Sequence, residues 1–238
     1  PVKSGPASRE PVPRVSVGLA VYNGGKLLSQ AIESVLAQDF GDFELIISDN
    51  CSTDQTEETC LHYQKMDRRI RYSRFSENLG MLTNFLNVLG LATAPFFMFA
   101  SHDDLREKTF MSACLPPFDR DPSVVLVYAR SKVFDANSQF LGIAQDRLMA
   151  DQDSPQERFK HLIWEIGMGN AIYGIFRTSI LKNITSWGEA LFGDNLLLAE
   201  LTLLGKIVQI DEPLFIRRLT RNYNYRSHDE RNTQLMSE

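Results

Sequence analysis

The sequence has few cysteines, no cluster of basic residues and no long apolar run. Its three cysteines, Cys51, Cys60 and Cys114, form no CxxC pair, which argues against a zinc site and a disulfide framework and favours reduced, buried thiols. Lys and Arg number 25 against 30 Asp and Glu, a net charge of -5, so nucleic acid is not expected as a partner. No apolar stretch approaches the roughly 18 residues that a membrane-spanning helix needs.

The remaining composition is that of a globular protein. The chain has 238 residues, of which 43% are hydrophobic and 23% charged, enough for one large domain or two tightly joined halves. Residues 1–13 are rich in Pro, Ser and Arg and lack the apolar core of a signal peptide, so we expect a flexible tail and a cytoplasmic protein.

The first half alternates short apolar runs with amphipathic stretches, the pattern of a parallel sheet covered by helices. Ser52 and Gln55 stand at the spacing of a capping box and predict a helix start close behind Asp49. Four such repeats fill roughly the first 105 residues, near the expected 30 residues per βαβ unit. We predict strands at 14–23, 43–50, 68–75 and from Pro95, and helices at 26–38, 51–66 and 78–92.

The second half is less regular. Residues 123–135 and 170–177 are predicted to be strands. Ser154 is the predicted N-cap of a helix. Another helix is predicted from Asp194 to Gly205, and the residues after it read as two strand pieces broken at Pro213. A boundary near 115–121 divides residues 14–115 from 116–238, which we expect to be two functional halves of one compact domain.

Polar residues end the predicted parallel strands, at Tyr22, at Asp49 and at the pair Asp103 and Asp104. Ligands of open α/β sheets bind at the carboxyl ends of the strands, so these groups are expected to converge on one crevice. Adjacent carboxylates repel, and Mg²⁺ or Mn²⁺ bridging to substrate phosphates would stabilise them. In the alternative, Asp104 caps a helix near Glu107 and Asp103 is merely solvated.

Three segments together resemble the family 2 glycosyltransferases, nucleotide-sugar-dependent enzymes of the GT-A fold. They are "PRVSVGLAVYNGGKLLSQAIESVLAQDFGDFELIISDNCSTDQT", "ENLGMLTNFLN" and "FMFASHDDL". Their order and spacing agree with the family across roughly residues 15–105, and "GDNLLLAELTLLGKIVQIDEPLFIRR" resembles its acceptor-side segment. The resemblance implies an α/β protein with a Rossmann-like, mostly parallel central sheet and helices on both faces.

The resemblance also assigns a donor site. It implies that Ala20, Tyr22 and Asp49 lie around the nucleotide base, and that Asn78 and Gly80 belong to a loop that closes over it. Residues 14–115 would therefore bind the nucleotide-sugar donor and residues 116–238 the acceptor.

Metal and catalytic roles follow from the same resemblance. Asp103 matches the later acid of a DxD-like motif, which holds a divalent cation on the diphosphate, alone or with Asp104. Asp194 matches the acceptor-side carboxylate that acts as catalytic base, although an aspartate there could also be a helix N-cap. Family members commonly have an acid where this chain has Ser101 and an Asp-Asp pair where it has Asp49-Asn50, which weakens the expected metal site.

The expected activity is transfer of a sugar from a nucleotide diphosphate, a UDP-sugar in our expectation, to an acceptor hydroxyl with inversion. A saccharide or a lipid-linked saccharide is the expected acceptor, which points to polysaccharide biosynthesis and to peripheral association with the inner face of a membrane. One alternative is a catalytically silent nucleotide-sugar-binding protein. Another, a nucleotidyltransferase, is disfavoured because no Gly-rich loop with basic residues follows the first strand. Trp187 and His228 are weaker candidates for acceptor and metal contacts.

Overall fold

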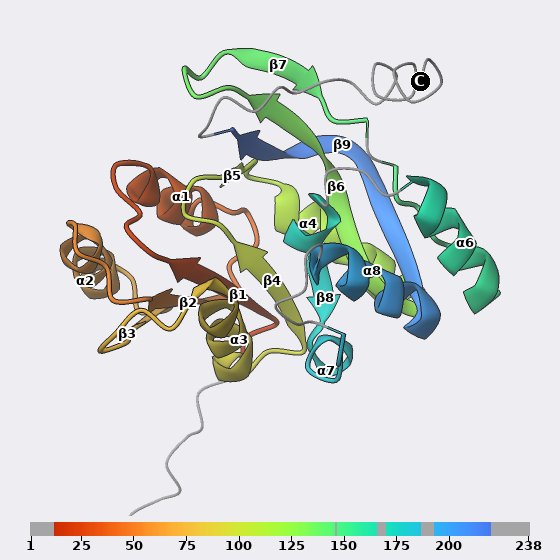
Figure 1. The fold of residues 1–238 in the computed structure, drawn as a ribbon, viewed down its shortest axis with the longest axis horizontal. Coiled ribbons are helices and arrows are strands. Elements are labelled where there is room, and N and C mark those ends of the chain that lie inside the picture. Colours follow the sequence, from red (N-terminus) through yellow and green to blue (C-terminus); the bar gives the residue numbers. More distant parts are fainter. Residues whose placement is uncertain (1–11, 146, 166–169, 187–192, 220–238) are drawn as a thin grey trace, which may run out of the picture.

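A single sheet crosses both halves of the computed structural model, which describes residues 12–145, 147–165, 170–186 and 193–219 (Figure 1). Its strand order is β3-β2-β1-β4-β8-β6-β9-β5, and β7 pairs with β6. The strands are β1 (Val15–Val21), β2 (Phe43–Asp49), β3 (Ile70–Arg74), β4 (Phe96–Ala100), β5 (Leu105–Arg106), β6 (Val124–Phe134), β7 (Phe140–Ile143), β8 (Ile175–Arg177) and β9 (Lys206–Arg218).

The first four long strands form the parallel part of the sheet. β1 pairs in parallel with β2 and β4, and β2 pairs in parallel with β3. Val21 at the end of β1 lies opposite Asp49 at the end of β2. The carboxyl ends of β2, β1 and β4 therefore lie side by side at one edge, as the sequence predicts. Beyond β4 the directions mix, because β8 runs antiparallel to both β4 and β6.

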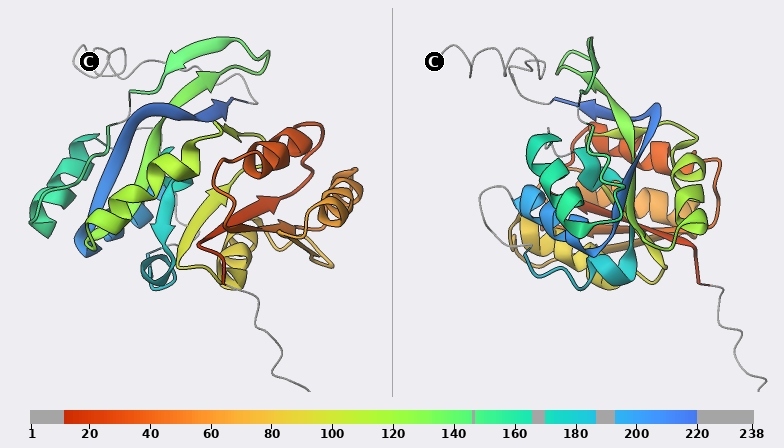
Figure 2. Two further views of the ribbon diagram at one scale, coloured as in Figure 1. Left: turned by 180° about the vertical axis from the view of Figure 1, so that it is seen from behind. Right: turned by 90° about the vertical axis from the view of Figure 1, so that its right-hand side faces the viewer.

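Helices cover both faces of the sheet, which confirms the predicted α/β class. Val17 and Leu19 of β1 pack into one apolar cluster with α1, α2, α4 and α5, whereas Ala20 packs into a second with α3, α6, α7 and α8. Figure 2 shows the two helical layers in its edge-on view. The helices are α1 (Leu27–Leu36), α2 (Thr56–Met66), α3 (Met81–Leu91), α4 (Phe110–Cys114), α5 (Pro116–Arg120), α6 (Pro155–Glu165), α7 (Thr178–Leu181) and α8 (Gly193–Leu204), with a 3-10 helix, η1 (Asn170–Tyr173).

Gly18 shows why β1 can lie so close to the helix above it. A Cβ at Gly18 would stand 2.5 Å from the Phe97 ring and 2.8 Å from a methyl carbon of Val88 on α3. Only glycine leaves room for this contact between strand and helix. The close packing fixes α3, and with it the segment before α3, against the carboxyl edge of the sheet.

Three local predictions are wrong. Ser52 makes no capping box for α2, because the helix begins only at Thr56 and the Ser52 hydroxyl oxygen accepts the N–H of Asn23 instead. Pro213 does not break the last strand: β9 continues through it, and the pairing with β6 shifts register there. The predicted strand at 170–177 is mostly the 3-10 helix η1, with strand structure limited to β8.

The expected burial is confirmed for two of the three cysteines and is wrong for Cys51. Cys60 and Cys114 are buried free thiols, and Cys51 is a partly exposed free thiol in the loop after β2. Across the residues that the structure places, no helix is both long enough and apolar enough to span a membrane.

Candidate active site at the carboxyl edge of the sheet

The loops after β1 and β2 are joined by hydrogen bonds between backbone and side chains. The backbone N–H of Asn23 donates to the hydroxyl of Ser52 at 2.9 Å, and Asn23 Oδ1 accepts from the N–H of Thr53 at 2.8 Å. Gly24 N–H donates to the hydroxyl of Thr56 at 2.9 Å. Asn23 has a φ of 51°, a left-handed conformation that Asn tolerates better than most residues. The two loops therefore form one rigid unit.

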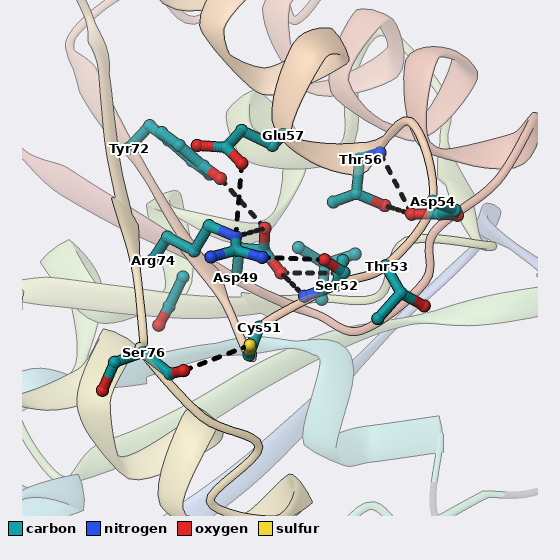
Figure 3. A network of polar contacts seen from close by, with 12 residues as sticks. Asp49, Cys51, Ser52, Thr53, Asp54, Thr56, Glu57, Tyr72, Arg74 and Ser76 are labelled. Atoms are coloured by element: carbon teal, nitrogen blue, oxygen red, sulfur yellow. Dashed lines mark hydrogen bonds and ion pairs between the residues drawn. The ribbon is translucent and has the colours of Figure 1, made fainter.

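Asp49 is the buried centre of this unit (Figure 3). Its Oδ1 accepts hydrogen bonds from the N–H and the hydroxyl of Ser52, at 2.8 and 2.5 Å. Its Oδ2 accepts the hydroxyl of Tyr72 at 2.9 Å and lies 3.4 Å from Nε of Arg74. Asp49 has no exposed surface, so its direct partners are protein groups, and its contacts fix the loop that follows β2.

Asn50, the next residue, holds the segment before α3. Its Nδ2 donates to Asn78 Oδ1 at 2.8 Å and to the carbonyl of Gly80 at 3.1 Å, while its Oδ1 accepts from Leu79 N–H at 2.9 Å. A carboxylate could accept from Leu79 but could not donate to the other two oxygens. The structure thus gives a physical reason for Asn at this position, where the family commonly has Asp.

The remaining predicted donor residues lie at the end of β1. Ala20 is 8% exposed within the strand, and Tyr22 is 45% exposed just after it. Buried Asn84 of α3 was not anticipated from the sequence: its Nδ2 donates to the carbonyls of Val21 at 3.2 Å and Ser48 at 3.0 Å. The sequence signal that could have indicated this residue is a polar side chain one helical turn before Val88, on the face of α3 that is buried.

Asp103 and Asp104 follow β4 and have different environments. Asp103 is half-buried, its carboxylate accepts the Ser101 hydroxyl, and its backbone carbonyl accepts from Arg218 Nε. Asp104 is buried, and its Oδ1 accepts the backbone N–H of Arg218 at 2.9 Å. Burial, together with the neighbouring charge of Asp103, raises the pKa of Asp104 to about 6. Asp104 therefore holds β9 and caps no helix, so the alternative reading of this pair is wrong.

A metal site in this region would depend on few protein ligands. Within the described ranges, no group of three or more His, Cys, Asp or Glu side chains is placed to hold a metal ion. Mg²⁺ is nonetheless commonly held by one or two carboxylates together with substrate phosphates. The half-buried carboxylate of Asp103, with Asp104 beside it, fits that sparse arrangement.

The predicted acceptor-side acid, Asp194, lies at the start of α8. Asp194 is exposed in the first turn of α8, so it is not the N-cap of that helix. Desolvation by the surrounding protein raises its pKa, and the positive charge of Arg217 acts in the opposite direction. Burial raises the pKa of the Tyr173 hydroxyl, and the charges of Asp103, Asp104 and Asp194 raise it further. The pKa of Tyr173 is therefore influenced by carboxylates of both residues 14–115 and residues 116–238.

The structure therefore orders the predicted residues along one edge. Asn50, next to Asp49, contacts the loop of Asn78 and Gly80, while Asp103 follows β4, two strands away from β2. Trp187 and His228 lie outside the described residues, as does most of the Arg- and Tyr-rich segment at the end of the chain.

The chain belongs to glycosyl transferase family 2, whose model matches residues 16–184. A Bacillus subtilis protein named as a teichuronic acid biosynthesis glycosyltransferase, TuaG, is 28% identical over 177 residues, 73% of this chain and 64% of that protein. The GalNAc(5)-diNAcBac-PP-undecaprenol beta-1,3-glucosyltransferase of Campylobacter jejuni is 38% identical over 95 residues, 39% of this chain and 30% of that enzyme.

Solved structures share the fold. S. aureus TarS 1-349 in complex with UDP-GlcNAc superposes with a TM-score of 0.71 at 21% identity, covering 94% of this chain and 64% of that one. The mannosyltransferase PcManGT from Pyrobaculum calidifontis, in complex with GDP-Man and Mn²⁺, has a TM-score of 0.64 at 15% identity over 90% of this chain and 59% of its own. The chain spans less than two thirds of the length of each of these four proteins.

Proposed function

We propose that this protein is a metal-assisted glycosyltransferase that moves a sugar from a nucleotide diphosphate, a UDP-sugar, to an acceptor hydroxyl with inversion. The observation that carries the proposal is the position of Asp103 and Asp104 directly after β4, at the carboxyl edge of the parallel strands, in a chain of glycosyl transferase family 2. A TarS structure that contains UDP-GlcNAc supports the choice of donor class.

The donor would bind at the rigid edge formed by the loops after β1 and β2. Ala20 and Tyr22 would lie beside the nucleotide base, where the exposed Tyr22 ring offers a stacking surface. Buried Asp49 would act by holding this edge in shape, and Asn78 and Gly80 would close over the base from the loop that Asn50 holds. A preorganised site of this kind lowers the entropic cost of binding.

Asp103 would hold the cation on the donor diphosphate, with Asp104 as the neighbouring carboxylate. When bound, Mg²⁺ or Mn²⁺ supplies charge stabilisation to the leaving diphosphate. The chain's own contribution is the position of the Asp103 carboxylate, which Ser101 and the backbone contact to Arg218 restrict. The PcManGT complex with Mn²⁺ supports a metal in this fold.

Asp194 would take the proton from the acceptor hydroxyl. A general base works best when its pKa is near the working pH, and desolvation shifts the pKa of Asp194 in that direction. Attack on the anomeric carbon from the face opposite the leaving diphosphate would invert the configuration. The exposure of Asp194 leaves it accessible to an acceptor that arrives from solvent.

The acceptor would be a saccharide or a lipid-linked saccharide, in polysaccharide biosynthesis. The name of TuaG refers to teichuronic acid, and that of the Campylobacter jejuni enzyme to an undecaprenol-linked substrate. Such an acceptor would place the protein in the cytoplasm, associated peripherally with the inner face of a membrane.

Ligand-dependent thermal stability tests the donor site. The midpoint of unfolding is measured with UDP, GDP, CDP and ADP, with and without Mn²⁺, for the parent and for Asp103→Ala. We expect one diphosphate to raise the midpoint only with Mn²⁺, because a ligand at 100 times its dissociation constant adds about 2.7 kcal/mol to the stability of the folded state. We expect Asp103→Ala to abolish the effect. If none of the four stabilises the parent, the proposal is wrong.

A further inference from the structure

The segment between β4 and β5, residues 101–104, carries both acids and forms no strand of its own. Pairing of β4 with β8 ends at Met98 opposite Ile175, and β5 begins only at Leu105. The residues between them include Asp103 and form no regular strand. Their conformation must therefore be fixed by contacts with other parts of the chain.

Two arginines supply those contacts, one at each end of the segment. Arg106 is buried, and its guanidinium donates to the carbonyl of Phe99 at the end of β4. Arg218, near the end of β9, donates through Nε to the carbonyl of Asp103. Its backbone N–H also donates to Asp104 Oδ1 at 2.9 Å. Arg218 therefore contacts both acidic residues, one through its side chain and one through its backbone.

Arg218 also reaches a third part of the fold. Its Nη1 donates to Gln30 Oε1 on α1 at 2.6 Å. The guanidinium is planar and presents its donors in a fixed geometry, so a bond to Gln30 on one side restrains the direction of the bond to Asp103 on the other. Lysine, with one flexible ammonium group, cannot reproduce both bonds in this geometry.

We propose that Arg218 is a positioning residue that holds the Asp103–Asp104 turn in the geometry required to bind the cation and the donor diphosphate. The inference rests on the proposed function. It assigns to the acceptor-side half of the chain a direct part in shaping the donor site, through strand β9. Groups that orient a metal-binding carboxylate typically change metal affinity or activity by 10- to 100-fold when they are lost.

The test measures how much Mn²⁺ the protein needs to bind UDP, or whichever diphosphate stabilises the parent. The Mn²⁺ concentration that gives half of the ligand-induced rise in unfolding midpoint is compared for the parent, Arg218→Met, Arg218→Lys and Gln30→Ala. We expect this concentration to rise roughly 10- to 100-fold in Arg218→Met and less in Arg218→Lys. Gln30→Ala, which leaves the bond to Asp103 in place, is expected to show a small rise in the same direction.

Arg177→Lys is the matched control. Arg177 is also partly buried and donates to backbone carbonyls, to Val124 at 2.7 Å and to Phe118 at 3.1 Å, but it does not contact the Asp103–Asp104 turn. We expect it to lower the unfolding midpoint without changing the Mn²⁺ requirement. If Arg218 only stabilised the fold, Arg218→Met would likewise lower the unfolding midpoint and leave the Mn²⁺ requirement unchanged.

The outcomes separate the two proposals. If the parent binds the diphosphate with Mn²⁺ and Arg218→Met keeps the parental Mn²⁺ requirement, the inference alone is overturned. If Arg218→Met does not fold, a Gln30→Ala variant with an unchanged Mn²⁺ requirement overturns it equally. If no diphosphate stabilises the parent with Mn²⁺, the proposed function fails and the inference fails with it.

Discussion

Glu44, near the amino end of β2, and Asp104, after the carboxyl end of β4, are both buried carboxylates, but their pKa values shift in opposite directions. At the amino end, Glu44 accepts from the Ser16 hydroxyl at 2.6 Å, from the hydroxyl and N–H of Thr93 at 2.6 and 3.0 Å, and from Arg71 at 2.7 Å. Burial alone would raise the pKa of Glu44, but these hydrogen bonds outweigh it and the pKa is lowered.

For Asp104 the balance is reversed, and the pKa of Asp194 shifts in the same direction. Burial raises the pKa of Asp104 to about 6, and desolvation raises that of Asp194. The charge on Glu44 is stabilised by surrounding donors, which favours folding, whereas the charges on Asp104 and Asp194 are poorly compensated. Shifts of this second kind concentrate at functional sites. The comparison teaches that the donors around a buried acid, more than its burial, decide in which direction its pKa shifts.

The largest expected effect is a loss of sugar transfer on substitution of Asp194. Asp194→Asn removes the proposed base and keeps the side-chain volume, so sugar transfer should fall roughly 10²- to 10⁴-fold. Donor binding and the unfolding midpoint should change little, because Asp194 is exposed. Steady-state transfer rates and calorimetric titration with the donor diphosphate measure the two quantities. Parental transfer by the variant would remove Asp194 from the mechanism.

Glu44 should show the opposite behaviour. Glu44→Ala leaves the hydroxyls of Ser16 and Thr93 without their acceptor, which should cost roughly 2 to 3 kcal/mol of unfolding free energy. Transfer per folded molecule should stay parental. Urea unfolding measures the loss, and Glu58→Ala, at an exposed position in the first turn of α2, is the control expected to be nearly neutral. Equal unfolding free energies of Glu44→Ala and Glu58→Ala would show that the donors around Glu44 do not stabilise the fold.

A smaller effect is expected at Asn50. Asn50→Asp places a carboxylate against the oxygens of Asn78 and Gly80, to which Asn50 now donates. Loss of these bonds should cost roughly 1 to 2 kcal/mol of stability and weaken donor binding through the displaced loop. Unfolding and diphosphate titrations measure both. A variant that binds the donor like the parent would show that this loop does not shape the site.

The smallest effect is a pH dependence at the amino end. Since the pKa of Glu44 is lower in the folded state than its ordinary value of 4.5, the unfolded chain binds more protons between the two values. The stability from Glu44 is thus present above pH 4.5 and is lost as the pH falls through the folded-state pKa. The difference in unfolding free energy between the parent and Glu44→Gln should shrink in that window, and a constant difference would contradict the assignment.

The sequence predicts the parallel part of the fold well, because it follows from local patterns, and the same patterns suggest where a site would lie. Apolar runs that alternate with amphipathic stretches place β1, β2, β3 and β4, and acids directly after buried strands lie at the carboxyl edge whatever the details of packing. The carboxyl ends of the strands then meet by topology alone.

The missed features depend on partners far away in the chain. Ser52 has the spacing of a capping residue, but its hydroxyl oxygen accepts the N–H of Asn23, 29 positions away, and α2 begins only at Thr56. Pro213 would break many strands, yet β9 tolerates it where the pairing with β6 is irregular. The contact of Arg218 with Asp103 spans 115 positions, and no local pattern in the sequence signals it.

The most direct test of the central claim is release of UDP from a panel of UDP-sugars, measured for the parent and Asp103→Asn with Mn²⁺ or with a chelator. We predict that the parent releases UDP from one donor by slow transfer to water, only with Mn²⁺, and that Asp103→Asn does not. Tight binding of a UDP-sugar without any release of UDP, even with saccharide acceptors added, would contradict the account and indicate a binding protein that keeps the fold of the family without its chemistry.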